Sequence, residues 1–124
     1  MRILHVEDDP DVLEIAALAF EFAGEVELRQ CASGQDAVDV LKGEGFDVVL
    51  LDVMMNGMDG PSTLRELRQT KYGAELPAIF MTGRAREAEI QELLGEGAVG
   101  VITKPFDPVT LVDEIKSILA SPAN

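Results

Sequence analysis

The chain has 124 residues, of which 47% are hydrophobic, and this suits one globular domain with one core. Its 23 acidic and 10 basic side chains give a formal net charge of −13, a field that argues against direct binding to nucleic acid or to a membrane surface. The lone Cys31 rules out an internal disulfide, and no apolar run approaches the ~20 residues of a membrane span. We therefore expect a soluble cytoplasmic protein.

An apolar run and a capping pattern predict the first strand and the helix that follows it. Ile3 to Val6 is a short apolar strand, and Asp9 followed by Pro10 is typical of a helix N-cap and first helical residue. Gly24 ends this helix. The apolar residues that we expect to face the core are Val12, Ile15, Ala16, Ala19, Phe22 and Ala23.

The same helix carries a second apolar stripe, formed by Leu13, Ala17 and Phe20, on the side away from this expected core face. A helix that is apolar on two sides is either deeply buried or docks a partner. The residues alone leave both alternatives open.

A second strand and helix follow. Val26 to Gln30 is more polar than the first strand, as is typical of a strand near the edge of a sheet. Ser33 begins a helix through a capping box, and Gly43 ends it. The apolar residues carried by this helix are Ala37, Val38 and Leu41.

The central stretch runs from Val48 through Leu51 and ends in an acid, Asp52. A continuous apolar run without alternation predicts a strand buried on both faces of a parallel sheet. Gly57 and Gly60 then turn the chain away. Because ligands bind outside the carboxyl ends of such strands, Asp52 is predicted to lie where the chemistry happens.

The rest of the chain continues the alternation of strand and helix. The expected elements are a helix over 61–71, a strand over 77–81 before Thr82, a helix over 85–94, a strand over 99–103 before Lys104, and a last helix that Asp107 caps and Pro108 begins. The pattern predicts one α/β domain over 1–124, a doubly wound five-stranded parallel sheet in the flavodoxin-like order 2-1-3-4-5 with five helices.

Polar side chains follow four of the expected strands. Glu7 and Asp8 follow the first, Asp52 ends the third, Thr82 the fourth and Lys104 the fifth. In a parallel sheet these ends share one edge, where three carboxylates would repel one another strongly, so without a ligand they must be hydrated, partly protonated or neutralised by a cation. Oxygen ligands indicate a hard ion such as Mg²⁺, and a carboxylate, a metal, a lysine and a hydroxyl are the parts of a phosphoryl-transfer site.

Four motifs, VEDDP, LLDVMMNGMDG, MTGRA and ITKPF, follow in order at these strand ends. With them the whole chain resembles the receiver domains of two-component response regulators. The resemblance implies that Asp52 is the phosphoacceptor and that Thr82 and Lys104 contact the phosphoryl oxygens. It also implies a Mg²⁺ site whose ligands are Asp8, Asp52, the backbone carbonyl of Met54 and, through a water, Glu7.

The chain departs from the family pattern at two positions. Asn56 stands where a proline is usual, and this is expected to loosen the loop after Asp52. Val101 occupies the switch position, where the family usually has an aromatic ring that swings inward as Thr82 moves. The resemblance also implies a cis peptide bond before Pro105.

As a receiver, the chain would accept a phosphoryl group from a phosphohistidine of a sensor histidine kinase or a histidine phosphotransfer protein. It would then signal through changed contacts with an unknown downstream protein, as a phosphoacceptor domain rather than a classical enzyme. The chain ends at Asn124, just past the last expected helix, so no output domain is expected. The chain would then be either a stand-alone regulator or a receiver domain excised from a larger protein.

Three alternatives compete with this hypothesis. The first is a receiver-like interaction module that works without phosphorylation. The second is an aspartate-based phosphatase, which generally needs an acid two residues after the nucleophile, where this chain has Met54. The third is an FMN-binding flavodoxin, which needs a hydroxyl- and glycine-rich loop after the first strand, where this chain has three acids.

Overall fold

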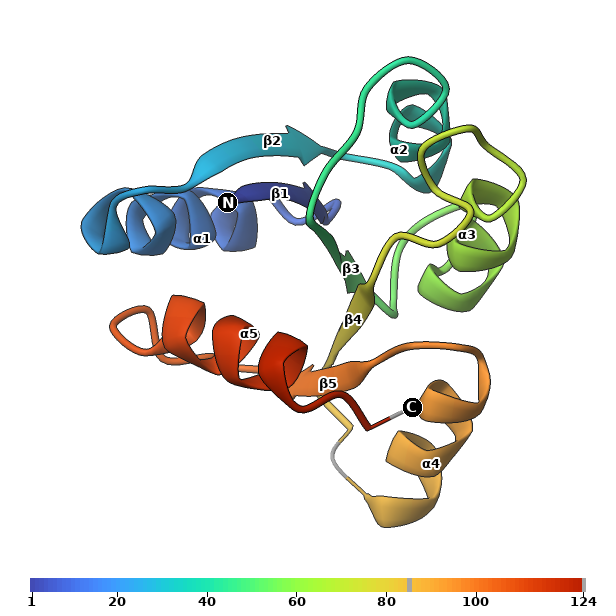
Figure 1. The fold of residues 1–124 in the computed structure, drawn as a ribbon. Helices are drawn as coiled ribbons and strands as arrows, with labels where there is room; N and C mark the ends of the chain where they lie inside the picture. The colour runs from blue at the N-terminus through green and yellow to red at the C-terminus, as the bar shows by residue number, and fades with distance from the viewer. Residues whose placement is uncertain (85, 124) are drawn as a thin grey trace.

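The computed structural model describes residues 1–84 and 86–123, which form one sheet of five parallel strands flanked by helices (Figure 1). The elements in chain order are β1 (Arg2–Val6), α1 (Pro10–Ala23), β2 (Glu27–Cys31), α2 (Gly34–Val40), β3 (Val48–Asp52), α3 (Gly60–Leu67), β4 (Ala78–Thr82), α4 (Glu87–Gly95), β5 (Gly100–Thr103) and α5 (Leu111–Ala120). The strand order is β2-β1-β3-β4-β5, which confirms the predicted doubly wound topology.

The helices cover both faces of the sheet. Helices α1 and α5 pack on one face, and α2, α3 and α4 pack on the other (Figure 1). Every residue of β3 and of β4 is buried, as expected for central strands of a parallel sheet covered on both sides. The continuous apolar run before Asp52 is therefore explained by a strand that has no solvent-facing side.

The register of the strands brings their polar ends to one edge of the sheet. Val6 of β1 lies opposite Leu51 of β3. The residues that come next in the chain, Glu7 and Asp52, are therefore neighbours. Pairing continues across the sheet from Asp52 to Met81 and from Thr82 to Thr103. The residues that follow β1, β3, β4 and β5 consequently meet at the carboxyl edge.

The buried face of α1 differs from the prediction. Ala16, Ala19 and Phe20 are buried, whereas Ile15 and Phe22, which were expected to face the core, are 46% and 74% exposed. Residues two apart on a helix point about 200° apart, so burial of Phe20 turns Phe22 to the surface. Phe20 packs edge-on against His5 of β1, with the ring centroids 6.4 Å apart. This contact fixes the rotation of α1 on the sheet.

The helix caps at α1 and α2 are as predicted, but α3 and α5 are shorter than expected. Asp9 caps α1 by accepting a hydrogen bond from the Asp11 amide at 2.9 Å, and Ser33 caps α2 by accepting one from Asp36 at 3.1 Å. Helix α3 ends at Leu67, and after Arg68 the amides of Gln69 and Thr70 bond three residues back instead of four.

The predicted start of α5 at Pro108 is wrong. Asp107 instead caps a separate turn, in which its carboxylate accepts from the Val109 amide at 2.9 Å and its carbonyl accepts from Thr110. The helical bonding of α5 begins with the Glu114 amide to the Thr110 carbonyl. The helix itself therefore begins at Leu111, three residues later than predicted.

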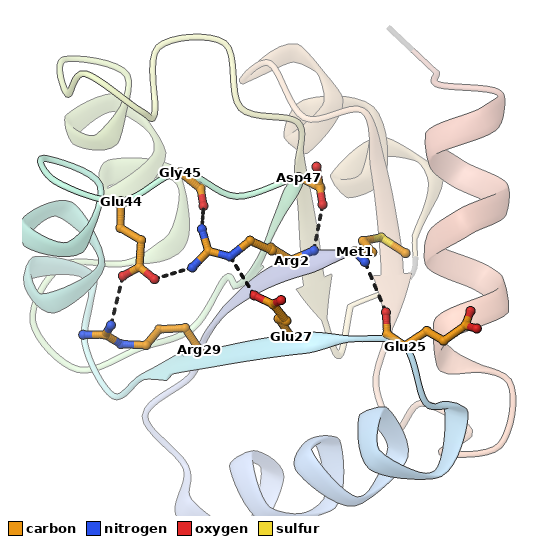
Figure 2. Close-up of polar contacts among 8 residues, drawn as sticks. All are labelled: Met1, Arg2, Glu25, Glu27, Arg29, Glu44, Gly45 and Asp47. Atoms are coloured by element: carbon orange, nitrogen blue, oxygen red, sulfur yellow. Dashed lines mark hydrogen bonds and ion pairs between the residues drawn. The ribbon is translucent and has the colours of Figure 1, made fainter.

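The amino-terminal edge of the sheet holds a separate polar cluster, shown in Figure 2. The Arg2 guanidinium bonds Glu27 at 3.1 Å and also contacts Glu44 and the Gly45 carbonyl, while it stacks on the Phe46 ring. Glu44 also pairs with Arg29 at 3.0 Å. These pairs connect β1, β2 and the loop before β3, far from the carboxyl edge. Because they are exposed to solvent, they add little to the stability of the fold.

Among residues 1–84 and 86–123, no helix has the length and apolar character needed to cross a bilayer.

Two phenylalanines of α1 provide a test of its orientation. Phe20→Ala should lower the free energy of unfolding by about 3–5 kcal/mol, because it empties a fully buried site. Phe22→Ala should change it by no more than about 0.5 kcal/mol, because that ring lies at the surface. Urea denaturation followed by circular dichroism measures both, and equal losses in the two variants would contradict this packing.

Candidate functional site

Three carboxylates converge at the carboxyl edge of the sheet. Glu7 and Asp8 lie in the loop after β1, and Asp52 is the last residue of β3. One ligand oxygen from each lies within 4.8 Å of the other two. Glu7 is 1% exposed and Asp52 is 2% exposed, whereas Asp8 is half-buried. Buried acids this close repel one another unless a cation offsets their charge or one of them takes up a proton.

Lys104 supplies one such charge. It lies in the loop after β5, and its Nζ is 2.6 Å from Glu7 Oε1 and 2.6 Å from Asp52 Oδ1. Its own amide donates to the Thr82 carbonyl at 2.8 Å, which holds the loop beside β4. The Lys104–Pro105 peptide bond is cis, which confirms the prediction from the resemblance.

The pKa values of Glu7 and Lys104 are set by burial and by neighbouring charges. Burial raises the pKa of Glu7, and the neighbouring charge of Asp52 adds to the increase, although the hydrogen bond from Lys104 opposes it. Burial by itself lowers the pKa of Lys104, but the two carboxylates together raise it above the ordinary value. Lys104 therefore stays an ammonium at neutral pH.

The charge of the site fits a divalent cation. Three carboxylates and one ammonium leave a formal charge of −2 if all four groups are ionised. The donor atoms are oxygens, which a hard ion such as Mg²⁺ prefers. The oxygen donors of Glu7, Asp8 and Asp52 therefore fit the divalent metal ion that was predicted from the sequence.

Thr82 ends β4 beside this cluster and is 3% exposed. Its hydroxyl accepts a hydrogen bond from the Arg84 amide at 3.0 Å, so it also fixes the start of the loop toward α4. Thr82 lines a cavity of about 210 Å³ that is also lined by Met54, Arg84 and residues of α4. The end of β4 and one side of α4 therefore border the same cavity.

The loop after Asp52 is anchored where it leaves the sheet. The Val53 amide donates to the Met81 carbonyl at 3.0 Å, and the Gly60 amide donates to the Val53 carbonyl at 2.9 Å. A Cβ on Gly60 would lie 2.5 Å from the Asp52 carbonyl oxygen, which only a glycine permits. Met54, whose carbonyl was predicted to bind metal, directly follows Val53, which both of these hydrogen bonds hold in place. The Met54 side chain is 67% exposed.

The sequence analysis did not identify Gly60 as a residue that shapes the site. Its signal was present, because Gly60 is the first residue of a helix that Asp59 caps. A glycine at that point indicates a turn, but its closeness to the Asp52 backbone becomes visible only in three dimensions.

His5 lies on β1 two residues before Glu7 and is completely buried. The Gln30 side-chain amide donates to His5 Nδ1 at 3.1 Å and to the Leu13 carbonyl at 2.8 Å. Burial, with a smaller effect from the charge of Lys104, lowers the pKa of His5 to about 4. His5 is therefore a neutral core residue at physiological pH.

Val101, the predicted switch position, is half-buried on β5 and packs against the core on the α2–α3–α4 face. It lies opposite Phe80 of β4, two residues before Thr82. The structure thus places Val101 on β5, the strand next to β4, which Thr82 ends. The other six predicted site residues gather around the carboxyl edge of the sheet.

An apolar surface adjoins the site on the α1 side. Ile15, Leu18 and Phe22 of α1 are 46%, 59% and 74% exposed. We call these three residues the α1 belt. They line two grooves toward the β5–α5 loop, and the groove nearer the site, of about 300 Å³, is lined by Val12, Ile15, Lys104, Pro105 and Phe106.

Comparison with known proteins supports the motifs read from the sequence. A family profile described as "Response regulator receiver domain" matches residues 3–116. The transcriptional regulatory protein YvrH of Bacillus subtilis is 32% identical over 117 residues, which cover 94% of this chain and 48% of YvrH. The response regulator SaeR of Staphylococcus aureus is 30% identical over 118 residues, covering 95% and 50%. This chain thus spans about half the length of the curated relatives it matches.

Solved structures show the same similarity in three dimensions. The chemotaxis protein CheY4 of Vibrio cholerae has a TM-score of 0.85 at 26% identity, covering 94% of this chain and 97% of that one. The receiver domain of the sensor histidine kinase PA1611 of Pseudomonas aeruginosa has a TM-score of 0.84 at 27% identity, covering 97% and 98%. That domain was solved with a magnesium ion coordinated in its active site cleft.

Proposed function

The chain belongs to the response regulator receiver domain family of two-component systems, and from this premise we propose that Asp52 accepts a phosphoryl group from a phosphohistidine. The donor is a sensor histidine kinase or a histidine phosphotransfer protein, and the output is a changed contact with a downstream protein. In this proposal residues 1–124 act as one receiver domain. The observation that carries it is the pairing of Lys104 with both Glu7 and Asp52, beside Asp8.

The residues divide the chemistry among them. An Asp52 carboxylate oxygen attacks phosphorus, the N–P bond of the phosphohistidine breaks, and the imidazole leaves with the electron pair. Lys104 exchanges a carboxylate for a phosphoryl oxygen and acts there as a point charge. The Thr82 hydroxyl turns from the Arg84 amide to donate to a second phosphoryl oxygen.

The metal is also part of the proposal. Asp8, Asp52 and the Met54 carbonyl would hold Mg²⁺, with Glu7 acting through a water. When bound, the ion supplies positive charge that offsets the charge of the phosphoryl oxygens. The formal charge of −2 in the site and the magnesium in the PA1611 receiver domain support this assignment.

Asp52→Asn tests the phosphoacceptor. The protein is incubated with acetyl phosphate and Mg²⁺, and intact mass spectrometry should show the gain of one phosphoryl group in the wild type and no gain in the variant. Asp9→Asn is the matched control, since asparagine caps α1 as well as aspartate does and should leave labelling intact. Labelling of Asp52→Asn at the wild-type level would refute the assignment.

The α1 belt is proposed as the docking surface for the phosphodonor. It is apolar and exposed, and its groove reaches Lys104, so a partner seated there would bring its histidine to the site. The helical surface of a kinase or phosphotransfer protein suits a groove between a helix and a loop. The net charge of −13 further favours a partner surface rimmed by basic residues.

Leu18→Glu tests this docking surface. A carboxylate in the belt should slow phosphotransfer from a phosphorylated histidine kinase domain by on the order of 10-fold, by removing an apolar contact. Labelling by acetyl phosphate should stay unchanged, because that donor needs no docking. Gln69→Glu is the control, because it adds the same charge at an exposed position just after α3, on the opposite face of the sheet from α1. Equal transfer rates in the two variants would rule out the belt.

The signal is proposed to run through α4. Its one buried side chain among the described residues is Leu93, so the helix has little core contact to resist a shift. Thr82 lines the cavity that α4 borders, whereas the half-buried Val101 has no ring to swing inward. A valine at this position stays in place while Thr82 moves.

Val101→Ala should therefore leave phosphorylation and its structural response nearly intact. Amide hydrogen exchange with and without beryllofluoride should show altered protection in the loop after Thr82 and in α4, in the variant as in the wild type. Thr82→Ala is the comparison and should lose that response. Changes confined to β5, with none in the loop or α4, would contradict the proposed route.

A further inference from the structure

The loop between β3 and α3 returns to the site through one main-chain contact. The Asn56 amide donates to Asp8 Oδ2 at 2.7 Å, across 48 positions of the sequence. Gly57 follows with φ of 76°, a left-handed turn that directs the chain away again. Within the described part of the chain, no other hydrogen bond connects residues 54–58 to the rest of the domain.

Asp8 is also the acid that Lys104 does not neutralise. Nζ of Lys104 pairs with Glu7 and with Asp52, and among residues 1–84 and 86–123 no ion pair forms to Asp8. The partner of the Asp8 carboxylate is thus the Asn56 amide. A main-chain N–H bonded to a carboxylate is a charge-assisted contact, stronger than a neutral hydrogen bond.

We propose that the Asn56 main-chain N–H is a positioning group for the metal site. It holds the Asp8 carboxylate by Oδ2 and leaves Oδ1 directed to an ion shared with Asp52. This inference rests on the proposed function, because it assigns a role toward the same Mg²⁺. It reverses the expectation that a residue other than proline at this position only loosens the loop.

The physical basis is the narrow geometry that Mg²⁺ accepts. The ion needs near-octahedral ligands, so a carboxylate that rotates freely must lose that freedom when it binds. A hydrogen bond to one oxygen fixes the rotation in advance and leaves lone pairs of the other oxygen for the metal. Groups that orient a ligand in this way commonly change metal affinity 10- to 100-fold.

The same contact restrains a second proposed ligand. The chain is fixed at Val53, whose amide donates to the Met81 carbonyl, and again at Asn56. Met54 lies between these two anchors, so the path of its backbone carbonyl is limited at both ends. Loss of the Asn56 contact would release Asp8 and the Met54 carbonyl together.

The role belongs to the main chain and not to the side chain. Asn56 is exposed, and its side chain makes no hydrogen bond in the part of the chain that the structure describes. Alanine therefore keeps the N–H group, whereas proline removes it. This pair of variants separates the donor from every other property of the residue.

Isothermal titration calorimetry with MgCl₂ tests the inference. Asn56→Pro should weaken Mg²⁺ binding about 10-fold, and Asn56→Ala should leave the Kd within about 2-fold of the wild type. Asp8→Ala should weaken binding more than Asp9→Ala, because the first removes a ligand and the second only a helix cap. Equal Kd values for Asn56→Pro and Asn56→Ala would overturn the inference and leave the metal site standing.

Amide hydrogen exchange by NMR supplies a second measurement that does not need the proline variant to fold. The Asn56 amide should be protected in the wild type and in Asp9→Ala, and it should exchange at its intrinsic rate in Asp8→Ala. Intrinsic exchange in the wild type would overturn the inference. Failure of the wild type to bind Mg²⁺ in the calorimeter would overturn the proposed metal site and this role with it.

Discussion

Lys104 lies between two acids that are almost completely buried, and the rest of the site depends on these two ion pairs. Without the ammonium, Glu7 and Asp52 would face each other at close range in a region that excludes water, where like charges repel strongly. The pairs also connect the loop after β5 to the ends of β1 and β3. One side chain thereby offsets charge and holds three segments of the chain at the same edge.

The sheet makes this contact possible because all five strands run in the same direction. Their carboxyl ends meet at one edge, while the amino-terminal edge carries the Arg2 cluster and takes no part in the chemistry (Figure 2). The two faces also differ. Helix α1 buries Phe20 and leaves the α1 belt exposed beside Lys104, whereas α4 on the opposite face lies loosely beside Thr82. The proposed docking and output surfaces thus lie on opposite faces of the sheet, and each adjoins the same site.

The acids at the edge are neutralised unequally, and this asymmetry gives the site its proposed chemistry. Glu7 and Asp52 share an ammonium, whereas the partner of Asp8 among the described residues is a main-chain amide. In the proposed function, the remaining negative charge would favour a divalent cation at Asp8, and its positive charge would offset the repulsion between the acids and a phosphoryl group. Lys104 can meanwhile change partners without leaving the edge.

The sequence by itself determined the alternation of strands and helices, the caps at Asp9 and Ser33, and the position of Asp52 at a strand end, because periodicity, capping and glycine signals act within a few residues. The strand order followed from that alternation through general rules for parallel sheets. Only the tertiary structure decided that Phe20 and not Phe22 is buried, since an apolar helix can rotate until its best-fitting side chain meets the sheet. It alone also decided the contact between Asn56 and Asp8. A main-chain amide has no sequence signature, and its partner lies 48 positions away, where no local pattern can point.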